Sequence, residues 1–63
     1  MEHSEQKIIG VIKEVHGPVV VISCEILPPL RQALCAHLDD ETYIFEVHQH
    51  LDMNHLRAIS MQQ

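Results

Sequence analysis

The chain has 63 residues, enough for one small domain near the lower size limit for folding without disulfides or metals. Nine acidic residues against four basic ones give a formal net charge of −5. The basic residues are spread along the chain as Lys7, Lys13, Arg31 and Arg57. This balance argues against nucleic-acid binding, which needs clustered basic residues. The longest apolar run, Val19 to Ile22, is far too short to span a membrane, and the polar N-terminus is unlike a signal or transit peptide.

The first part of the chain predicts a tail followed by a hairpin. Residues 1–6 show no periodicity and are expected to form a flexible tail. Residues 7–16 are rich in Ile and Val and predict a strand, with a bulge or bend at Gly10. Gly17-Pro18 indicates a turn. Residues 19–24 are almost wholly apolar, so we expect a second strand that is covered on both faces or lies inside a closed barrel.

The middle of the chain fits two patterns. Pro28 and Pro29 predict a loop, because adjacent prolines cannot serve a strand ladder. After them, three leucines at spacings of four favour a helix: Leu30, Leu34 and Leu38. The alternative is a strand with two faces, Ala33, Cys35 and His37 against Leu34, Ala36 and Leu38. Periodicity alone favours the helix.

The last part of the chain predicts two more strands. Asp39-Asp40 indicates a turn, and residues 41–51 form the clearest strand pattern. One face of that strand carries Tyr43, Phe45 and Val47, and the other carries Thr42, Glu46, His48 and His50. Residues 52–54 predict a turn, and residues 55–61 alternate Leu56, Ala58 and Ser60 against Arg57, Ile59 and Met61. Tyr43 and Phe45 are the only aromatics, so the core is expected to consist of Val, Ile and Leu.

Candidate metal ligands are numerous but poorly spaced. Cys24 and Cys35 are eleven positions apart, and a chain without a secretion signal favours reduced thiols. A structural zinc site requires four ligands, usually in closely spaced pairs, and Cys35 with His37 is a single pair. His48 and His50 would share a strand face about 7 Å apart and chelate weakly. A solvated strand face is the simpler interpretation, and no metal ligand is assigned.

Catalytic patterns are equally weak. Nucleophilic catalysis needs a base within reach of the nucleophile, and no elbow motif surrounds Ser4, Ser23 or Ser60. The carboxylates of Asp39, Asp40 and Glu41 fall in a turn, where solvation explains them. No catalytic or cofactor-binding residue is assigned.

Four segments in order resemble the N-terminal domain of the ATP synthase beta subunit. The opening pattern G-x-I-x-x-V-x-G-x-V-V is carried by Gly10, Ile12, Val15, Gly17, Val19 and Val20. Ala33-Leu34 match the family's A-L pair after a proline loop. Residues 43–51 match its L-V-L-E-V-Q-Q-x-L strand, with identity at Glu46, Val47, Gln49 and Leu51. The closing R-x-I-x-M is matched by Arg57, Ile59 and Met61. The chain departs from the family at Val21, where Asp is usual, at Asp52-Met53-Asn54, which replaces a Gly-rich turn, and at Tyr43 and Phe45, which replace smaller aliphatics.

The resemblance implies an all-β fold, a small closed or nearly closed antiparallel barrel of five to six short strands. The barrel would span residues 7–63 and end before a nucleotide-binding domain, and residues 33–38 would be a strand. The implied role is structural: packing against alpha-subunit barrels in the crown of the hexameric head, in the cytoplasm at the periphery of a bacterial inner membrane. Self-association of the isolated domain is a further expectation.

ATP, ADP and Mg would belong to the parent subunit, which couples ion translocation to ATP synthesis or hydrolysis. Only Gly10 and Gly17 are present here, and neither begins the phosphate-binding G-x-x-x-x-G-K-[ST] motif. This domain is therefore expected to bind no cofactor and to be no enzyme by itself. The alternative is a free-standing barrel adaptor that presents His48 and His50 to a ligand or metal.

Overall fold

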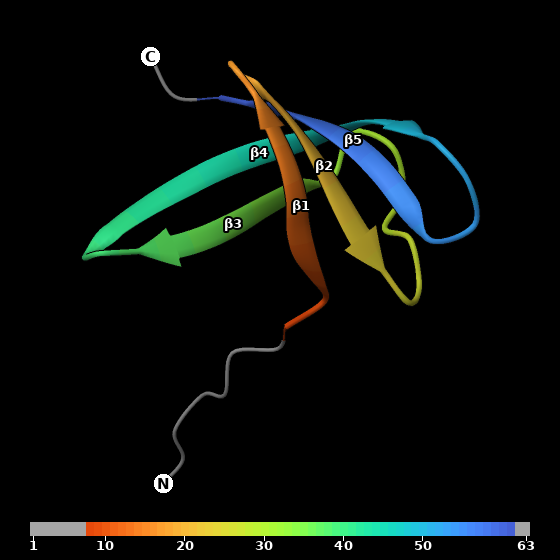
Figure 1. Ribbon diagram of the computed structural model, residues 1–63, viewed down its shortest axis with the longest axis horizontal. Coiled ribbons are helices and arrows are strands. Elements are labelled where there is room, and N and C mark those ends of the chain that lie inside the picture. The colour runs from red at the N-terminus through yellow and green to blue at the C-terminus, as the bar shows by residue number, and fades with distance from the viewer. Residues whose placement is uncertain (1–7, 62–63) are drawn as a thin grey trace, which may run out of the picture.

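The computed structural model describes residues 8–61, which form five strands and no helix (Figure 1). The strands are β1 (Gly10–His16), β2 (Val19–Cys24), β3 (Ala33–Leu38), β4 (Glu41–His50) and β5 (His55–Ser60). The predicted tail at residues 1–6 and the predicted strand start at Lys7 lie outside the described residues. The expected all-β fold is confirmed.

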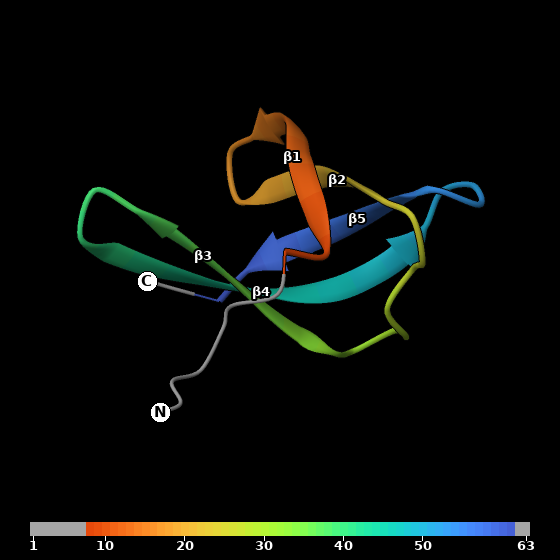
Figure 2. The ribbon, with the colours of Figure 1, turned by 90° about the horizontal axis from the view of Figure 1, so that it is seen from below.

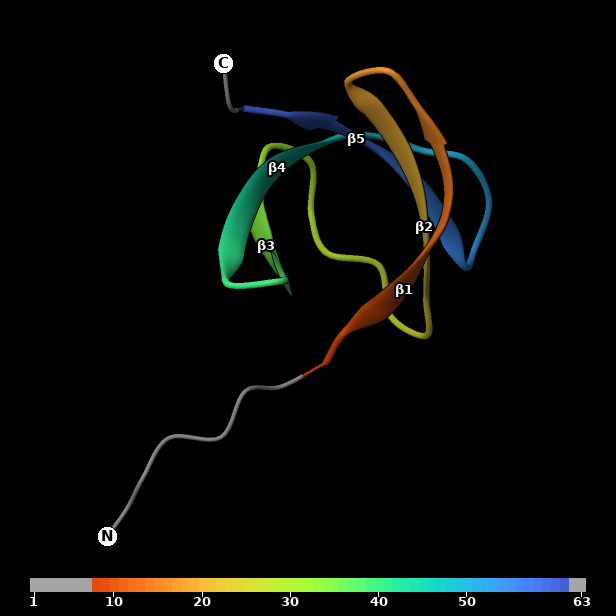
Figure 3. The same cartoon turned by 60° about the vertical axis from the view of Figure 1, so that its left-hand side comes forward.

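All five strands belong to one antiparallel sheet with the order β1-β2-β5-β4-β3. The sheet curls strongly, so that it forms a half-barrel (Figures 2 and 3). β1 and β3 are its two edges, and within residues 8–61 they do not pair with each other. The architecture is therefore a small, nearly closed barrel whose seam lies between β1 and β3.

Two tight turns make the outer hairpins. Gly17 has φ of 61° in the β1–β2 turn, a left-handed conformation that glycine adopts without steric cost. Asp39 and Asp40 both have positive φ, 49° and 68°, as the two central residues of a type I′ turn require. Such turns match the right-handed twist of paired strands. Both predicted turns are confirmed.

Residues 33–38 form β3, so the helix favoured by periodicity is wrong and the strand implied by the family resemblance is confirmed. Arg31 has φ of 76°, which interrupts any helix that would start after the prolines. All six residues of β3 pair with β4. Leu34 and Ala36 pack against the core, which supplies the tertiary contacts that override the leucine spacing.

The core lies on the concave face of the sheet. Its buried members are Val20, Ile22, Cys24, Phe45, Val47, Leu56 and Ala58. This set is mostly aliphatic, as expected, with one aromatic ring at Phe45. Of the two alternatives for residues 19–24, cover on both faces is wrong, because Val20, Ile22 and Cys24 are buried while Val19, Val21 and Ser23 are only half-buried. The strand instead lines the concave side of the nearly closed barrel. A one-layer sheet buries one face only.

Two irregularities in the ladders alter which way side chains point. In β1 the register shifts between Ile12 and Glu14, so the bulge lies at Lys13 rather than at Gly10. Gly10 has a different role: a Cβ there would lie 2.5 Å from the Ser23 carbonyl oxygen and 2.7 Å from Cys24 Sγ. In β4 the register shifts between Val47 and Gln49. A bulge inserts one extra residue and so reverses the alternation beyond it.

Candidate interaction surface

A cavity of about 530 Å³ occupies the seam of the half-barrel. One wall comes from Ile8 and Ile9, which precede β1, and from Ile12 in β1. The other comes from Leu34, Ala36 and Leu38 on β3. Phe45 and Ile22 form part of its floor. These side chains are apolar, and several remain exposed because no strand of the described chain lies between the two edges. The seam is thus an apolar groove bounded by two sheet edges.

The β3 edge presents an unguarded strand. Leu38 and Glu41 flank the two-residue turn, and Val47 N–H donates to the Gln32 carbonyl. Antiparallel ladders alternate, so the even-numbered residues of β3 bond to β4 and the odd-numbered ones turn their backbone groups outward. The outward residues are Ala33, Cys35 and His37. The strand contains no Lys, Arg, Asp, Glu, Pro or bulge, which are the usual protections of an edge.

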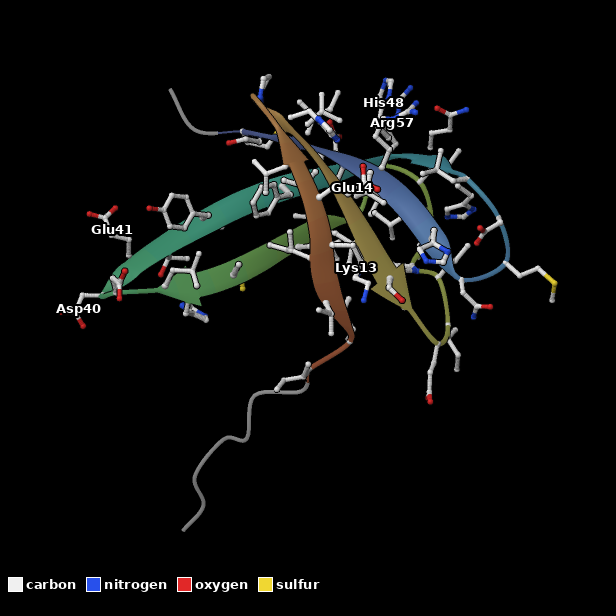
Figure 4. The ribbon with its side chains drawn as sticks, viewed as in Figure 1. Lys13, Glu14, Asp40, Glu41, His48 and Arg57 are labelled. Carbon is white, nitrogen blue, oxygen red and sulfur yellow. The ribbon has the colours of Figure 1, made fainter. Side chains whose placement is uncertain are left out.

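The β1 edge carries such protections. Its bulge at Lys13 breaks the regular spacing of the ladder. Lys13 and Glu14 are charged and exposed on this edge strand (Figure 4). His16 Nε2 lies 2.9 Å from Glu14 Oε1, and Pro18 follows in the turn. A further strand is therefore disfavoured at β1.

Opposite charges lie at the two ends of β3. Arg31 precedes the strand, and Asp39 and Asp40 follow it in the turn, all exposed. Figure 4 shows Asp40 and Glu41 at the tip of the β3–β4 hairpin. The carboxylates that sequence analysis assigned to a solvated turn are thus at an exposed hairpin tip. Along β3 the surface charge runs from positive to negative, with an uncharged strand between.

The outer face of the β3–β4 hairpin holds an arrangement that sequence analysis did not assemble. Cys35 Sγ lies 3.8 Å from His37 Nε2, and His37 Nδ1 lies 3.1 Å from Thr42 Oγ1. His37 and Thr42 are direct cross-strand partners, and this pairing could be predicted only once the β3–β4 register was known. The contact orients His37 and leaves Cys35 as an exposed thiol beside an imidazole.

His48 and His50 do not form the predicted pair on one face. The β4 bulge places His50 opposite Leu56, on the concave face, where its Nε2–H donates to the Pro28 carbonyl at 2.7 Å. His48 projects to the same side of the sheet as Arg57 (Figure 4). Arg57 lies between the buried Leu56 and Ala58 in β5, so that side is the convex face. The predicted shared face is therefore wrong. Within residues 8–61, no three His, Cys, Asp or Glu side chains gather into a group that could hold a metal ion.

The two cysteines are both free and lie in different surroundings. Cys24 is 2% exposed at the end of β2, and burial raises the pKa of its thiol. Cys35 is exposed on β3. A buried thiol is inert and an exposed one is accessible to reagents, so Cys35 is the reactive position of the pair.

The serines considered as nucleophiles are separated. Ser23 pairs with His55 in the β2–β5 ladder, and Ser60 pairs with Phe45 in the β4–β5 ladder. Ser4 lies outside the described residues. The two described serines come from different strands, and the ladder positions do not bring them into one site.

The β4–β5 turn is organised by Asp52. Its Oδ1 accepts the Asn54 backbone N–H at 2.8 Å and lies 2.9 Å from His55 Nδ1. The hydrogen bond from the Asn54 backbone, followed by that from the His55 side chain, lowers the pKa of the Asp52 carboxyl. Asn54 Nδ2 donates to the Cys24 carbonyl at 3.2 Å, which ties this turn to the end of β2. The predicted turn at residues 52–54 is confirmed.

Among the residues that the structure describes, none forms a helix long and apolar enough to cross a membrane. No protein-family model matches this chain, and no solved structure matches it. The resemblance to the ATP synthase beta subunit therefore rests on the ordered sequence segments and stays a prediction.

Proposed function

We propose that this chain is a non-catalytic structural domain that packs against neighbouring β-barrels, as the N-terminal domains of ATP synthase beta subunits do in the crown of the hexameric head. Its partners would be alpha-subunit barrels. Nucleotide, Mg and the ion-coupled synthesis or hydrolysis of ATP would belong to a separate domain of the parent subunit. The complex would lie in the cytoplasm at the periphery of a bacterial inner membrane.

The observation that carries this proposal is the set of apolar side chains on the convex face. Val11 on β1 is 59% exposed and Ile44 on β4 is 37% exposed. Val11 pairs with Ser23 and Ile44 pairs with Cys35, so both side chains point away from the core. Apolar side chains on the outer face of a small sheet contribute nothing to its own core, and contact with a neighbouring domain would remove them from water.

A second observation supports the same proposal. The sequence segments that resemble the beta subunit coincide with the β1–β2 hairpin, the start of β3, β4 and β5. Hydrogen bonding through most of the sheet makes such a domain stiff, because each inner strand is paired on both sides. Stiffness suits a collar that holds neighbours in place while other domains move.

The test is a binding experiment with an isolated alpha-subunit N-terminal barrel. We expect a complex in analytical ultracentrifugation and a binding isotherm in calorimetry. Val11→Ser should weaken the complex, because it removes an apolar side chain from the convex face. The matched control is Val15→Ser: Val15 is also on β1 and is 64% exposed, but it pairs with Val20 and faces the concave side.

Equal weakening by both variants would count against a convex-face contact, and no complex with the wild-type chain would overturn the proposal. In that event the alternative is a free-standing adaptor. Such an adaptor would not bind its ligand through His48 and His50 together, because the β4 bulge separates the two rings. The apolar groove between β1 and β3 is the remaining surface that favours an adaptor.

A further inference from the structure

The uncharged edge of β3 and the opposite charges at its ends form a self-complementary surface. The odd-numbered residues Ala33, Cys35 and His37 turn their backbone groups away from β4, as the ladder alternation requires. An exposed edge without charge, proline or bulge is a template for another strand. We propose that two copies of this chain associate through antiparallel β3–β3 pairing, centred on Cys35, into a two-fold symmetric dimer.

The register follows from the alternation. Outward backbone groups can exchange hydrogen bonds only with outward groups, so odd-numbered residues must face odd-numbered ones. In the register centred on Cys35, Cys35 pairs with Cys35 of the second copy. Ala33 of each chain pairs with His37 of the other, so every outward residue of the strand has a partner. These three pairs give about six hydrogen bonds across the junction, two per pair.

The charges favour this antiparallel arrangement and a second copy as the occupant. In the centred register, Arg31 of each chain lies alongside Asp39 of the other, so two opposite-charge contacts flank the junction. Parallel pairing would bring Arg31 near Arg31 and Asp39 near Asp39. Since like charges that face one another across strands destabilise pairing and opposite charges stabilise it, the ends of β3 select the antiparallel dimer. The strand itself adds no charge that would oppose it.

The groove adds an apolar contribution. Leu34 and Ala36 are half-buried on the concave side of β3 and line the cavity at the seam. In the centred register each Leu34 faces the second copy's Ala36, so the pairing extends the concave apolar face of both chains. The seam that remains open in one chain is thereby narrowed by the other. This interface uses the backbone edge of β3, whereas Val11 of the proposed collar contact lies on β1, and the inference does not rest on that contact.

Cross-linking at Cys35 tests the geometry directly. Residues of a hydrogen-bonded antiparallel pair have Cα atoms about 5.5 Å apart, and their Cβ atoms lie about 5 Å apart or more, beyond the distance of an unstrained disulfide. A bismaleimide reagent with a two-carbon spacer is therefore used to bridge the two thiols. Each maleimide double bond should add one Cys35 thiol, its S–H adding across the C=C bond, so that one reagent molecule links two chains. We expect a dimer on denaturing gels for wild type and Cys24→Ser, and none for Cys35→Ser.

Oppositely charged substitutions at Cys35, on the symmetry axis, test whether a second copy of this chain is what pairs with β3. Cys35→Lys and Cys35→Glu should each be monomeric in sedimentation, because each places two like charges opposite one another. An equimolar mixture of the two variants should recover a dimer that contains one chain of each, because opposite charges then meet at the axis. Cys35→Ser should remain dimeric. Circular dichroism of each variant checks that the exposed substitution leaves the fold intact.

Three results would overturn the inference: a monomeric wild type at all concentrations, a dimer that survives Cys35→Lys, or no recovery in the mixture. Protection of β3 amides by an added extended peptide, with a monomeric wild type, would assign the edge to another partner. Binding to an alpha-subunit barrel is read out separately with Val11→Ser, since Val11 lies on the convex face of β1 and takes no part in β3 pairing. The two proposals can therefore fail independently.

Discussion

The two edges of this sheet, β1 and β3, lie on opposite sides of one apolar seam but differ in chemistry. β1 carries a bulge at Lys13, a charged pair of residues and a proline in its turn. β3 is regular and uncharged, and its charges lie beyond its ends. An edge with irregular spacing and solvated charges resists addition of a strand, whereas a regular uncharged edge accepts one. The sheet thus has one edge, β1, that resists addition of a strand and one edge, β3, that accepts it.

The two edges are attached to the sheet through different strands. β1 is attached through β2, where Gly10 allows a close approach to Cys24. β3 is attached through β4 and by a type I′ turn. The edges have separate supports, but both depend on the central strands and their shared core. Variants at Leu56, Gly10 and Asp40 test this division, with hydrogen exchange measured strand by strand as their common readout. A fourth variant, at Asp52, lies outside it.

The largest effect is expected from Leu56→Ala, because Leu56 is fully buried in β5 beneath both halves of the sheet. Truncating a buried leucine costs about 2–5 kcal/mol, a large share of the stability of a domain this small. Urea unfolding should show that the Leu56→Ala chain is half unfolded or more even without urea. The amides of both edge strands should lose their protection from hydrogen exchange together. Leu56→Met, which conserves volume, should cost less than about 1.5 kcal/mol. Survival of either edge alone in the Leu56→Ala variant would contradict a shared core.

Gly10→Ala is expected to loosen the β1 edge selectively. The added Cβ would lie 2.5 Å from the Ser23 carbonyl oxygen, which cannot move without displacing β2. We expect a loss of about 1–3 kcal/mol in the free energy of unfolding, with faster amide exchange in β1 and β2. The control is Val11→Ala, at an exposed position one residue along. If β3 and β4 lost protection to the same degree, the edges would not be independently supported.

Asp40→Gly is expected to strengthen the β3 edge. Asp40 has φ of 68° in the β3–β4 turn, and glycine adopts that conformation without the Cβ penalty. The substitution should raise the free energy of unfolding by up to about 1 kcal/mol, measured in urea, and slow amide exchange in β3 and β4. Glu41→Gly, one residue later in the strand, should instead be destabilising. No gain from Asp40→Gly would mean that this turn does not limit the stability of the hairpin.

The smallest effect is expected from Asp52→Asn, which lies away from both edges. The folded-state pKa of Asp52 is lowered by hydrogen bonds from the Asn54 backbone and from His55. A lowered folded pKa stabilises the fold when the carboxyl is ionised, and this contribution is lost as the pH falls below about 4 toward the folded pKa. Wild type should therefore lose more stability than Asp52→Asn on acidification, measured by urea unfolding at several pH values. Equal pH dependence in the two proteins would remove Asp52 from the acid response.

Sequence patterns correctly located features that depend on neighbouring residues. The turns at Gly17 and at Asp39-Asp40 were predicted because their conformations are local. The shared face of Phe45 and Val47 was predicted because strand alternation has a fixed period of two, and the structure shows that this face is the buried one. Where a bulge occurs, that period fails, and so the expected partnership of His48 and His50 was wrong.

By itself, the sequence determined the turns and the alternating faces of the regular strands, because each follows from one or a few adjacent residues. The all-β class followed from the ordered segments that resemble the beta subunit, because local periodicity favoured a helix at residues 33–38. The tertiary structure decided three further features: the strand at residues 33–38, the bulges at Lys13 and beside His48, and the close contact at Gly10. Each requires a second strand at hydrogen-bonding distance, and leucine spacing or β propensity in one segment does not contain that partner. The asymmetry between the β1 and β3 edges belongs to this second group, since an edge exists only once the order of strands in the sheet is set.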